Sequence, residues 1–212
     1  MELRESGQIG NKRRIKGDFT LMAISLMPIA IAINLVIGEL VLIFKIPLFL
    51  DMIGTVIISM VAGPWVGMLT GAITNLVHGT WNPVLGAFFP VQVGMALVVG
   101  FMSKRGMVKS FWKAIVTALI AMVVTLAISV SITVVFFGGI TGTGSDAITA
   151  FMLSIGMDMW GAVLVQKVII ESLDRIFNVL IGMWIVKKMS DRFLSKHKYG
   201  DIYMKRYQKS KV

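Results

Sequence analysis

Long apolar runs alternate with short polar or basic segments along the whole chain. Six runs are apolar enough to form membrane-spanning helices: 20–44, 48–62, 65–77, 87–102, 114–137 and 162–186. A helix needs about 20 apolar residues to cross a bilayer, and somewhat fewer where its neighbours bury part of it. The pattern therefore predicts an all-α integral membrane protein, built as a bundle of six transmembrane helices.

The segments between these runs are short and carry turn residues. Lys45, Ile46 and Pro47 separate the first two spans, and Gly63-Pro64 predicts a tight turn before the third. Residues 78–86 are polar and predict a loop. The semi-apolar segment 148–159 is too short to cross a bilayer, so we expect an interfacial or re-entrant helix there.

Charge gives the predicted bundle an orientation. Eighteen of the 21 Lys and Arg residues lie in three stretches, within residues 4–16, 104–113 and 187–211. Cytoplasmic segments of membrane proteins are enriched in Lys and Arg, so all three stretches are predicted to be cytoplasmic. We expect a basic N-terminal segment (1–19), a six-helix membrane domain (20–188) and a basic tail (189–212) that forms an extended or frayed helix. Four spans before the central loop and two after it agree with both termini being cytoplasmic.

Composition supports a multi-pass protein of the cell membrane. Hydrophobic residues make up 56% of the chain, above the roughly 45–50% of soluble domains. The net charge of +10 is confined to the three basic stretches, which predicts attraction to anionic lipid rather than to nucleic acid. The first helix has no small-residue cleavage site after it, so we expect it to be retained. The chain has no cysteine, which excludes a disulfide or a thiol nucleophile.

Polar residues of the predicted spans gather in the outer half of the membrane. Ionisable groups in a membrane interior are costly and usually face a cavity or a partner. A channel or proton relay would need such groups through the full thickness, so the pattern predicts a substrate-binding cup that opens outward. The candidate substrate-binding residues are Glu39, Asn75, His78, Trp81, Gln92, Asp158, Trp160, Lys167, Glu171 and Arg175.

The residue types in this set indicate a small aromatic heterocycle, neutral or cationic, as the ligand. An acidic majority favours a cation such as thiamine or one of its precursors over a carboxylate vitamin. Lys167 and Arg175 would reverse that preference if both faced the pocket. No spacing predicts a metal site, a cofactor site or a catalytic nucleophile, so we expect no enzymatic activity.

Several polar residues of the outer half could have a purely structural role in place of binding a ligand. Glu171 and Arg175 are four residues apart and could pair only with each other. Trp81 and Trp160 could belong to an interfacial aromatic belt. Asp51 could cap the second helix.

Small residues recur at every fourth position in two spans. Gly63, Gly67, Gly71, Asn75 and Gly79 form one stripe along the third helix, and Ala30, Asn34 and Gly38 form another along the first. Small residues let two helix backbones approach closely in lipid. The third-helix stripe indicates either packing within the chain or a docking face, and we expect the first-helix stripe to dock another subunit.

Three segments resemble the substrate-binding S components of energy-coupling factor (ECF) transporters. They are Leu50-Asp51-Met52-Ile53-Gly54-Thr55, then Gly63-Pro64-Trp65-Val66-Gly67 with Gly71 and Asn75-Leu76, and Ala30-Ile31-Ala32-Ile33-Asn34 with Pro47. The resemblance implies capture of a vitamin outside the cell, a site built from outer loops and helices four to six, and association with a transmembrane coupling subunit and two ATPase subunits. The chain departs from the family at its docking pair: in place of Ala-x3-Ala it has Ala30-x3-Asn34 and Ala32-x3-Val36.

Other functions remain open at this stage. A ligand-sensing membrane module of a signalling system is the main alternative; it predicts a signalling domain after the sixth span, for which about two dozen residues are too few. An intramembrane enzyme would need a catalytic constellation built from His78, Glu171 and Asp174. A secondary transporter would show an inverted repeat, which halves of four and two spans do not.

Overall fold

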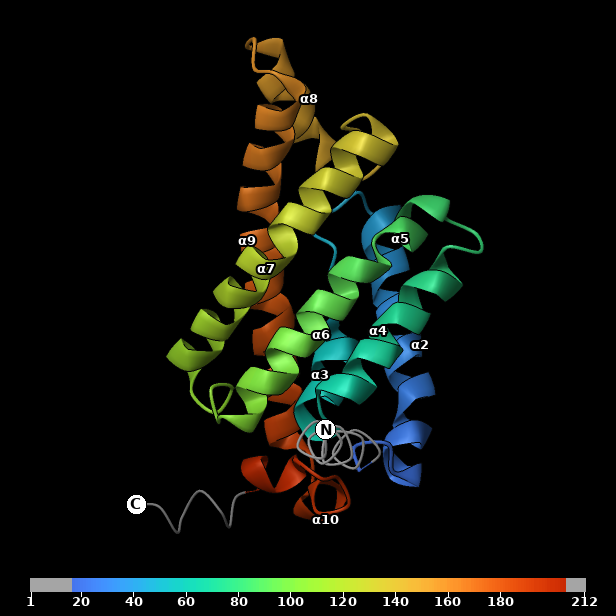
Figure 1. Ribbon diagram of the computed structural model, residues 1–212, viewed down its shortest axis with the longest axis vertical. Helices are drawn as coiled ribbons and strands as arrows, with labels where there is room; N and C mark the ends of the chain where they lie inside the picture. Colours follow the sequence, from blue (N-terminus) through green and yellow to red (C-terminus); the bar gives the residue numbers. More distant parts are fainter. Residues whose placement is uncertain (1–16, 205–212) are drawn as a thin grey trace, which may run out of the picture.

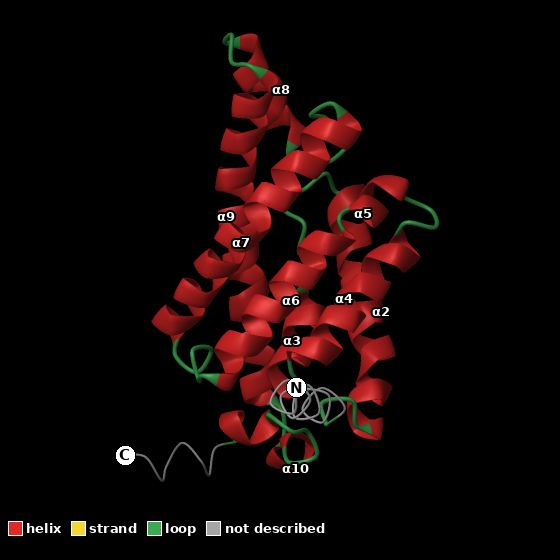
Figure 2. Cartoon of the chain, in the orientation of Figure 1, coloured by secondary structure: helices red, strands yellow, loops and turns green. Residues whose placement is uncertain are grey.

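The computed structural model describes residues 17–204, so most of the predicted N-terminal segment and the last eight residues of the tail lie outside the described part. Every regular element in the described part is helical (Figures 1 and 2). In chain order the α-helices are α2 (Leu21–Ile43), α3 (Ile53–Val61), α4 (Pro64–His78), α5 (Pro83–Ala87), α6 (Phe89–Lys104), α7 (Phe111–Phe137), α8 (Asp146–Ser154), α9 (Met159–Lys188) and α10 (Asp191–Leu194). A 3-10 helix, η1 (Gly200–Tyr203), follows.

The all-helical fold is confirmed, and a helix lies at each of the six predicted positions. Two of these helices, α2 and α7, are long and apolar enough to span a membrane. The prediction for residues 48–62 is wrong in extent, because α3 has only nine residues and cannot cross a bilayer by itself. Residues before α3 form an irregular loop in which Lys45 and Leu50 have positive φ angles of 54° and 50°. The prediction of a loop over residues 78–86 is correct only for residues 79–82. His78 is the last residue of α4, and residues 83–86 belong to α5.

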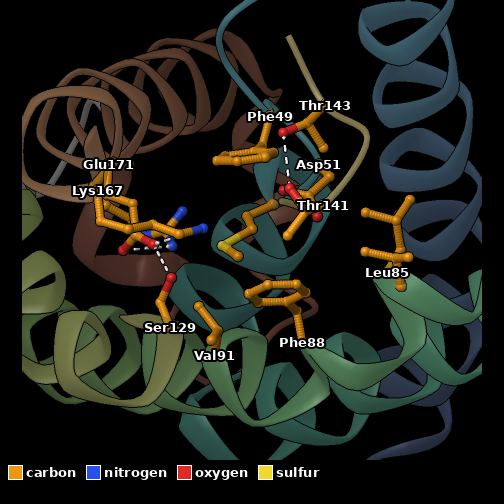
Figure 3. Close-up of a pocket in the computed structure, with 13 residues that line it drawn as sticks. Phe49, Asp51, Leu85, Phe88, Val91, Ser129, Thr141, Thr143, Lys167 and Glu171 are labelled. Carbon is orange, nitrogen blue, oxygen red and sulfur yellow. Dashed lines mark hydrogen bonds and ion pairs between the residues drawn. The ribbon is translucent and has the colours of Figure 1, made fainter. Parts of the chain in front are cut away.

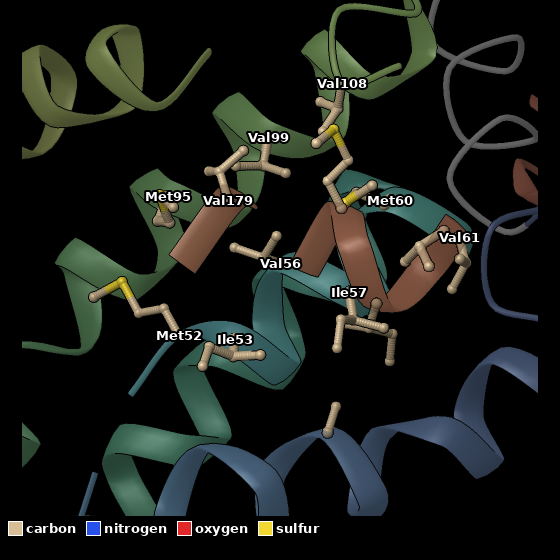
Figure 4. Packing of buried hydrophobic residues seen from close by; sticks show 14 of the residues in the cluster. Met52, Ile53, Val56, Ile57, Met60, Val61, Met95, Val99, Val108 and Val179 are labelled. Atoms are coloured by element: carbon tan, nitrogen blue, oxygen red, sulfur yellow. The ribbon is translucent and has the colours of Figure 1, made fainter. Parts of the chain in front are cut away.

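The short helix α3 forms the centre of the bundle. All nine of its residues are buried, and it packs against α2, α4, α6 and α9, while α7 packs on α6 and α9 (Figure 1). Val56 lies among Met60, Val99 and Val179 in the apolar core (Figure 4). A helix that is buried on every side is expected to be largely apolar, as α3 is apart from Thr55 and Ser59, whose hydroxyl groups are hydrogen-bonded.

Glycine permits the closest approach between helices. A Cβ atom added at Gly54 of α3 would lie 2.1 Å from the carbonyl oxygen of Ala30 in α2. A Cβ atom at Gly67 of α4 would lie 1.9 Å from Ser59 Oγ of α3. The glycine stripe of the third predicted span therefore packs within the chain.

The tail folds back onto one end of the bundle. Asp18, before α2, is buried, and its carboxylate contacts Lys198 Nζ at 2.6 Å, Tyr199 Oη at 2.9 Å and Lys104 Nζ at 3.5 Å. The Tyr203 hydroxyl lies 2.5 Å from Ser103 Oγ, and burial raises the pKa of this phenol well above its usual value. The described part of the tail, residues 189–204, is therefore not an extended or frayed helix, because it forms two short helices that pack on the bundle. Residue 18, the α6–α7 loop and the tail meet at one end, opposite α5 and α8 (Figure 1).

The outer surface of the bundle is more apolar than that of a soluble protein. Large apolar side chains are exposed along the outer faces of α2, α7 and α9, among them Val36, Val123 and Phe177. Asn, Gln, Asp, Glu, Lys and Arg side chains are buried inside. Soluble monomers rarely expose contiguous apolar surfaces of this kind.

The substitution Gly54→Ala tests the contact between α2 and α3. We expect it to lower stability by about 1–3 kcal/mol, because the new methyl group would collide with backbone that cannot turn away. The loss is measured as a lower melting temperature of the detergent-purified protein. The control is Gly94→Ala, where the added methyl meets only a Thr125 methyl at 3.1 Å and which we expect to change stability little. Equal melting temperatures for the two variants would contradict the packing described.

Candidate functional site

One face of α9 carries four charged side chains, and all of them are buried. Lys167, Glu171 and Arg175 follow each other at four-residue spacing, and Asp174 lies beside Arg175. Each is at most 3% exposed. The opposite face of the helix is apolar and exposed, for example at Ile169 and Leu173. The helix therefore directs its charge into the bundle.

These charges form a connected set of ion pairs. Arg175 binds Asp174 Oδ2 through Nη1 at 2.6 Å and Glu171 Oε2 through Nη2 at 3.4 Å. Lys167 Nζ lies 3.8 Å from Glu171 Oε1, and Ser129 of α7 donates a hydrogen bond to the same oxygen. Removing an ion from water costs several kcal/mol unless it is paired. Glu171 and Arg175 do pair, but not only with each other, because Glu171 also contacts Lys167 and Ser129 and Arg175 also binds Asp174.

Asp174 also holds the loop between α2 and α3 against α9. Its Oδ1 accepts hydrogen bonds from the backbone N–H groups of Phe49 at 3.0 Å and Leu50 at 2.8 Å. Asn178, one turn further on, accepts the N–H of Met52 at 3.2 Å. These bonds satisfy backbone donors that a helix would otherwise satisfy, and they stabilise the positive φ of Leu50. They place Phe49 and Asp51 beside the charged face.

A cavity of about 30 Å³ lies between this loop, α6, α7 and α9 (Figure 3). This volume holds little more than a water molecule. Its apolar wall consists of Phe49, Met52, Val84, Leu85, Phe88 and Val91. Its polar wall consists of Asp51, Ser129, Thr141, Thr143, Lys167, Glu171 and Arg175.

The loop from α7 to α8 closes the cavity. Asp146 Oδ2 accepts the backbone N–H groups of Thr141 at 2.9 Å, Gly142 at 2.6 Å and Thr143 at 3.1 Å, which folds the loop into a compact turn. A Cβ atom at Gly144 would lie 2.3 Å from the carbonyl oxygen of Lys45. The α7–α8 loop therefore touches the α2–α3 loop directly, and ligand of vitamin size could enter only if the two moved apart.

Of the ten candidate residues predicted from the sequence, Lys167, Glu171 and Arg175 line this cavity. Glu39, His78 and Trp81 form a separate cluster: His78 Nε2 lies 3.0 Å from Glu39 Oε2, and Trp81 Nε1 donates to the same oxygen at 3.5 Å. His78 borders a smaller cavity of about 10 Å³ that shares Phe49, Asp51 and Leu85 with the first. This second cluster is a neighbour of the site.

Gln92 and Asn75 belong to a buried amide network. Gln92 Nε2 donates to Asn75 Oδ1 and to the carbonyl oxygen of Asp51, both at 3.0 Å, and Gln92 Oε1 accepts from Thr55 Oγ1 at 2.8 Å. Neither amide lines the larger cavity. Their contacts position the backbone of Asp51 instead.

Asp158 and Trp160 lie away from the cavity. Asp158 is exposed and caps α9 by accepting the N–H of Gly161 at 3.1 Å. Trp160 is 51% exposed. The structure therefore does not bring these two residues to the site.

The predicted docking stripe of the first helix also faces inward. Ala30, Asn34 and Gly38 are buried, and Asn34 Oδ1 accepts the N–H of Gly54 at 2.7 Å. Asn34 Nδ2 donates to Thr55 Oγ1 at 2.8 Å and Thr74 Oγ1 at 3.2 Å. The assignment of this stripe to subunit docking is corrected, because its polar and small residues bind α3 and α4 of the same chain.

Several cavity residues were not predicted as site residues. Phe49, Phe88, Thr141 and Thr143 come from loops or helix starts, where no periodic pattern distinguishes them. The helix cap that the sequence allows for Asp51 is not formed by the residue before α3, which is Met52 and makes no side-chain cap. Within residues 17–204, no group of three His, Asp or Glu side chains could hold a metal ion.

Comparison of the chain with protein-family models, with curated proteins and with solved structures finds no match.

The substitution Asp174→Ala should release the α2–α3 loop. It removes the acceptor of two backbone N–H groups and leaves Arg175 with one carboxylate, so we expect a loss of about 3–5 kcal/mol in stability. Trypsin should then cleave faster after the exposed Lys45, and mass spectrometry of the fragments measures that rate. The matched control, Asp158→Ala, removes an exposed carboxylate that contacts no residue of the loop. Unchanged cleavage in Asp174→Ala would refute the role of Asp174 in holding the loop.

Proposed function

We propose that this chain is a six-span protein of the cell membrane with both termini cytoplasmic. In this proposal it is the substrate-binding S component of an ECF-type importer and captures a vitamin or related small heterocycle from outside. The resemblance at residues 50–55, 63–76 and 30–34 motivates the family. The apolar outer surface of the bundle and its closed polar cavity support a membrane protein that binds a ligand.

The six spans of the proposal are α2, α3, α4, α6, α7 and α9. The outer faces of α2, α4, α6, α7 and α9 carry exposed Leu, Ile, Val and Phe side chains, which lipid would cover, whereas α3 is buried among the other helices. The helix α3 is too short, but the loop before it continues the crossing. Irregular backbone is tolerated at membrane depth where protein buries it, and Asp174 and Asn178 accept the N–H groups of this loop.

The orientation rests on the basic segments. The α6–α7 loop and the tail meet at the end of the bundle that contains Asp18, and Lys and Arg are enriched in cytoplasmic segments. The cavity lies toward the other end, beneath the α7–α8 loop. With the basic end in the cytoplasm, the cavity belongs to the outer half of the membrane.

The observation that carries the proposal is that the polar face of α9 stops partway along the helix. Its core-facing residues after Asn178 are Val179, Gly182, Met183 and Val186, which are buried and apolar. A polar cavity above an apolar floor suits capture from one side, whereas a channel needs polar groups throughout. Release of the ligand to the other side then requires a partner. The family resemblance implies that this partner is a transmembrane coupling subunit with two ATPase subunits.

The proposal is tested by a thermal-shift screen of the detergent-purified protein against vitamins, their precursors and nucleobases. A ligand that binds only the folded state stabilises it by about 2.7 kcal/mol at a hundredfold excess over its Kd. We expect one aromatic heterocycle to raise the melting temperature. Phe49→Ala should weaken its binding about tenfold through lost stacking, whereas Phe177→Ala, on the exposed face of α9, should not.

Two results would contradict this function. One is a folded protein whose melting temperature no compound raises. The other is a shift that Phe49→Ala leaves unchanged, because the ligand would then bind elsewhere.

A further inference from the structure

The ammonium group of Lys167 occupies an aromatic site inside the cavity. Its Nζ lies 5.2 Å from the ring centroid of Phe49 and 4.9 Å from that of Phe88. These rings lie on opposite sides of the cavity in Figure 3. The ammonium is 3.8 Å from Glu171 and makes no hydrogen bond to any residue that the structure describes. Two ring faces and a carboxylate make this point favourable for a positive charge.

The Asp51 carboxylate faces the same cavity without a cation of its own. Within residues 17–204, no Lys, Arg or His nitrogen lies within 4.0 Å of it. Its Oδ1 is buried and has no hydrogen-bond partner. A buried acceptor without a partner is costly, so the closed cavity leaves one strong acceptor unsatisfied.

The charges around the cavity do not cancel. On α9 the two cations Lys167 and Arg175 balance Glu171 and Asp174. Asp51 adds a further carboxylate on the opposite side of the cavity. Asp51 and the α9 ion pairs, counted together, therefore have one negative charge in excess, which a cationic ligand would neutralise.

We propose that the ligand is a small planar cation, a protonated amino-heterocycle with one aromatic ring. Its ring takes the place of the Lys167 ammonium between Phe49 and Phe88, and its N–H group donates to Asp51 Oδ1. This inference rests on the proposed function and narrows its substrate class. The small cavity, of about 30 Å³ before the Lys167 head leaves it, favours a ligand with a single ring, and even that ring needs the α2–α3 and α7–α8 loops to move apart.

Lys167 is then an internal competitor that the ligand displaces. The alternative is an anionic ligand whose carboxylate accepts a hydrogen bond from the Lys167 ammonium. In that case Lys167 binds the ligand and does not compete with it. The two assignments predict opposite effects of Lys167→Met, which keeps an unbranched side chain of nearly the same length and removes its charge. Loss of a competitor strengthens binding, and loss of a binding group weakens it.

The experiment uses three probes of matched size on the detergent-purified full chain at pH 7. They are 4-aminopyridine as the cation, isonicotinamide as the neutral compound and isonicotinate as the anion, with Kd values measured by ligand-observed NMR titration. We expect 4-aminopyridine to bind most tightly. Lys167→Met should strengthen its binding at least threefold, and Asp51→Asn should weaken it roughly tenfold or more, as for a hydrogen bond between charged groups.

Two matched controls make the same substitutions away from the cavity. Lys188→Met changes an exposed residue at the end of α9, and Asp201→Asn changes an exposed residue of η1. Both should bind 4-aminopyridine as the unchanged protein does. Melting temperatures of all four variants verify that each is folded.

The inference is overturned if isonicotinate binds most tightly and Lys167→Met weakens it; the site then takes an anion, and the proposed capture function stands. It is also overturned if 4-aminopyridine binds equally to all variants, or if none of the three probes binds. In the last case the vitamin screen decides the proposed function separately, because a vitamin that binds would leave that function intact.

Discussion

The burial of four charged side chains on α9 is the constraint on which the rest of the structure depends. Ions removed from water destabilise a fold unless other groups replace their hydration. Here Arg175 pairs with two carboxylates, Ser129 donates to Glu171, and Asp174 accepts two backbone N–H groups of the α2–α3 loop. These requirements draw α7 and that loop onto α9, so the walls of the cavity exist because the charges need partners.

The other half of the bundle is held together by neutral groups. Asn34 joins α2 to α3 and α4, and Gln92 joins α6 to both α4 and the backbone of Asp51. Buried amides can specify one arrangement when each is fully satisfied. Glycine at residues 54 and 67 lets the backbones approach closely enough for these bonds to form. This network fixes the floor and one wall of the cavity, whereas two loops in mutual contact close it.

Much of the fold could be predicted from hydrophobic runs and turn residues, because these are local signals. The six helix positions follow from them, as does the turn at Gly63, which has a φ of 103°. The length of α3 could not be predicted, since its loop is shaped by Asp174, more than 120 residues away. The sequence placed Asn34 and Gln92 among polar residues of apolar helices, but an amide that binds a neighbouring helix and one that binds a ligand have the same local pattern. Asp51 and Phe49 were missed as site residues for the same reason: their role depends on which helix lies opposite.

The proposed function requires the cavity to lie in the outer half of a membrane whose other side contains the basic end. The chain has no cysteine, so single cysteines can be introduced and labelled without background. Thr80, exposed in the turn after α4, and Ser195, exposed after α10, lie at opposite ends of the bundle. In intact cells, a membrane-impermeant maleimide should label Thr80→Cys directly and Ser195→Cys only after the cells are permeabilised. Labelling of Ser195→Cys from outside, or of both residues from the same side, would contradict the account.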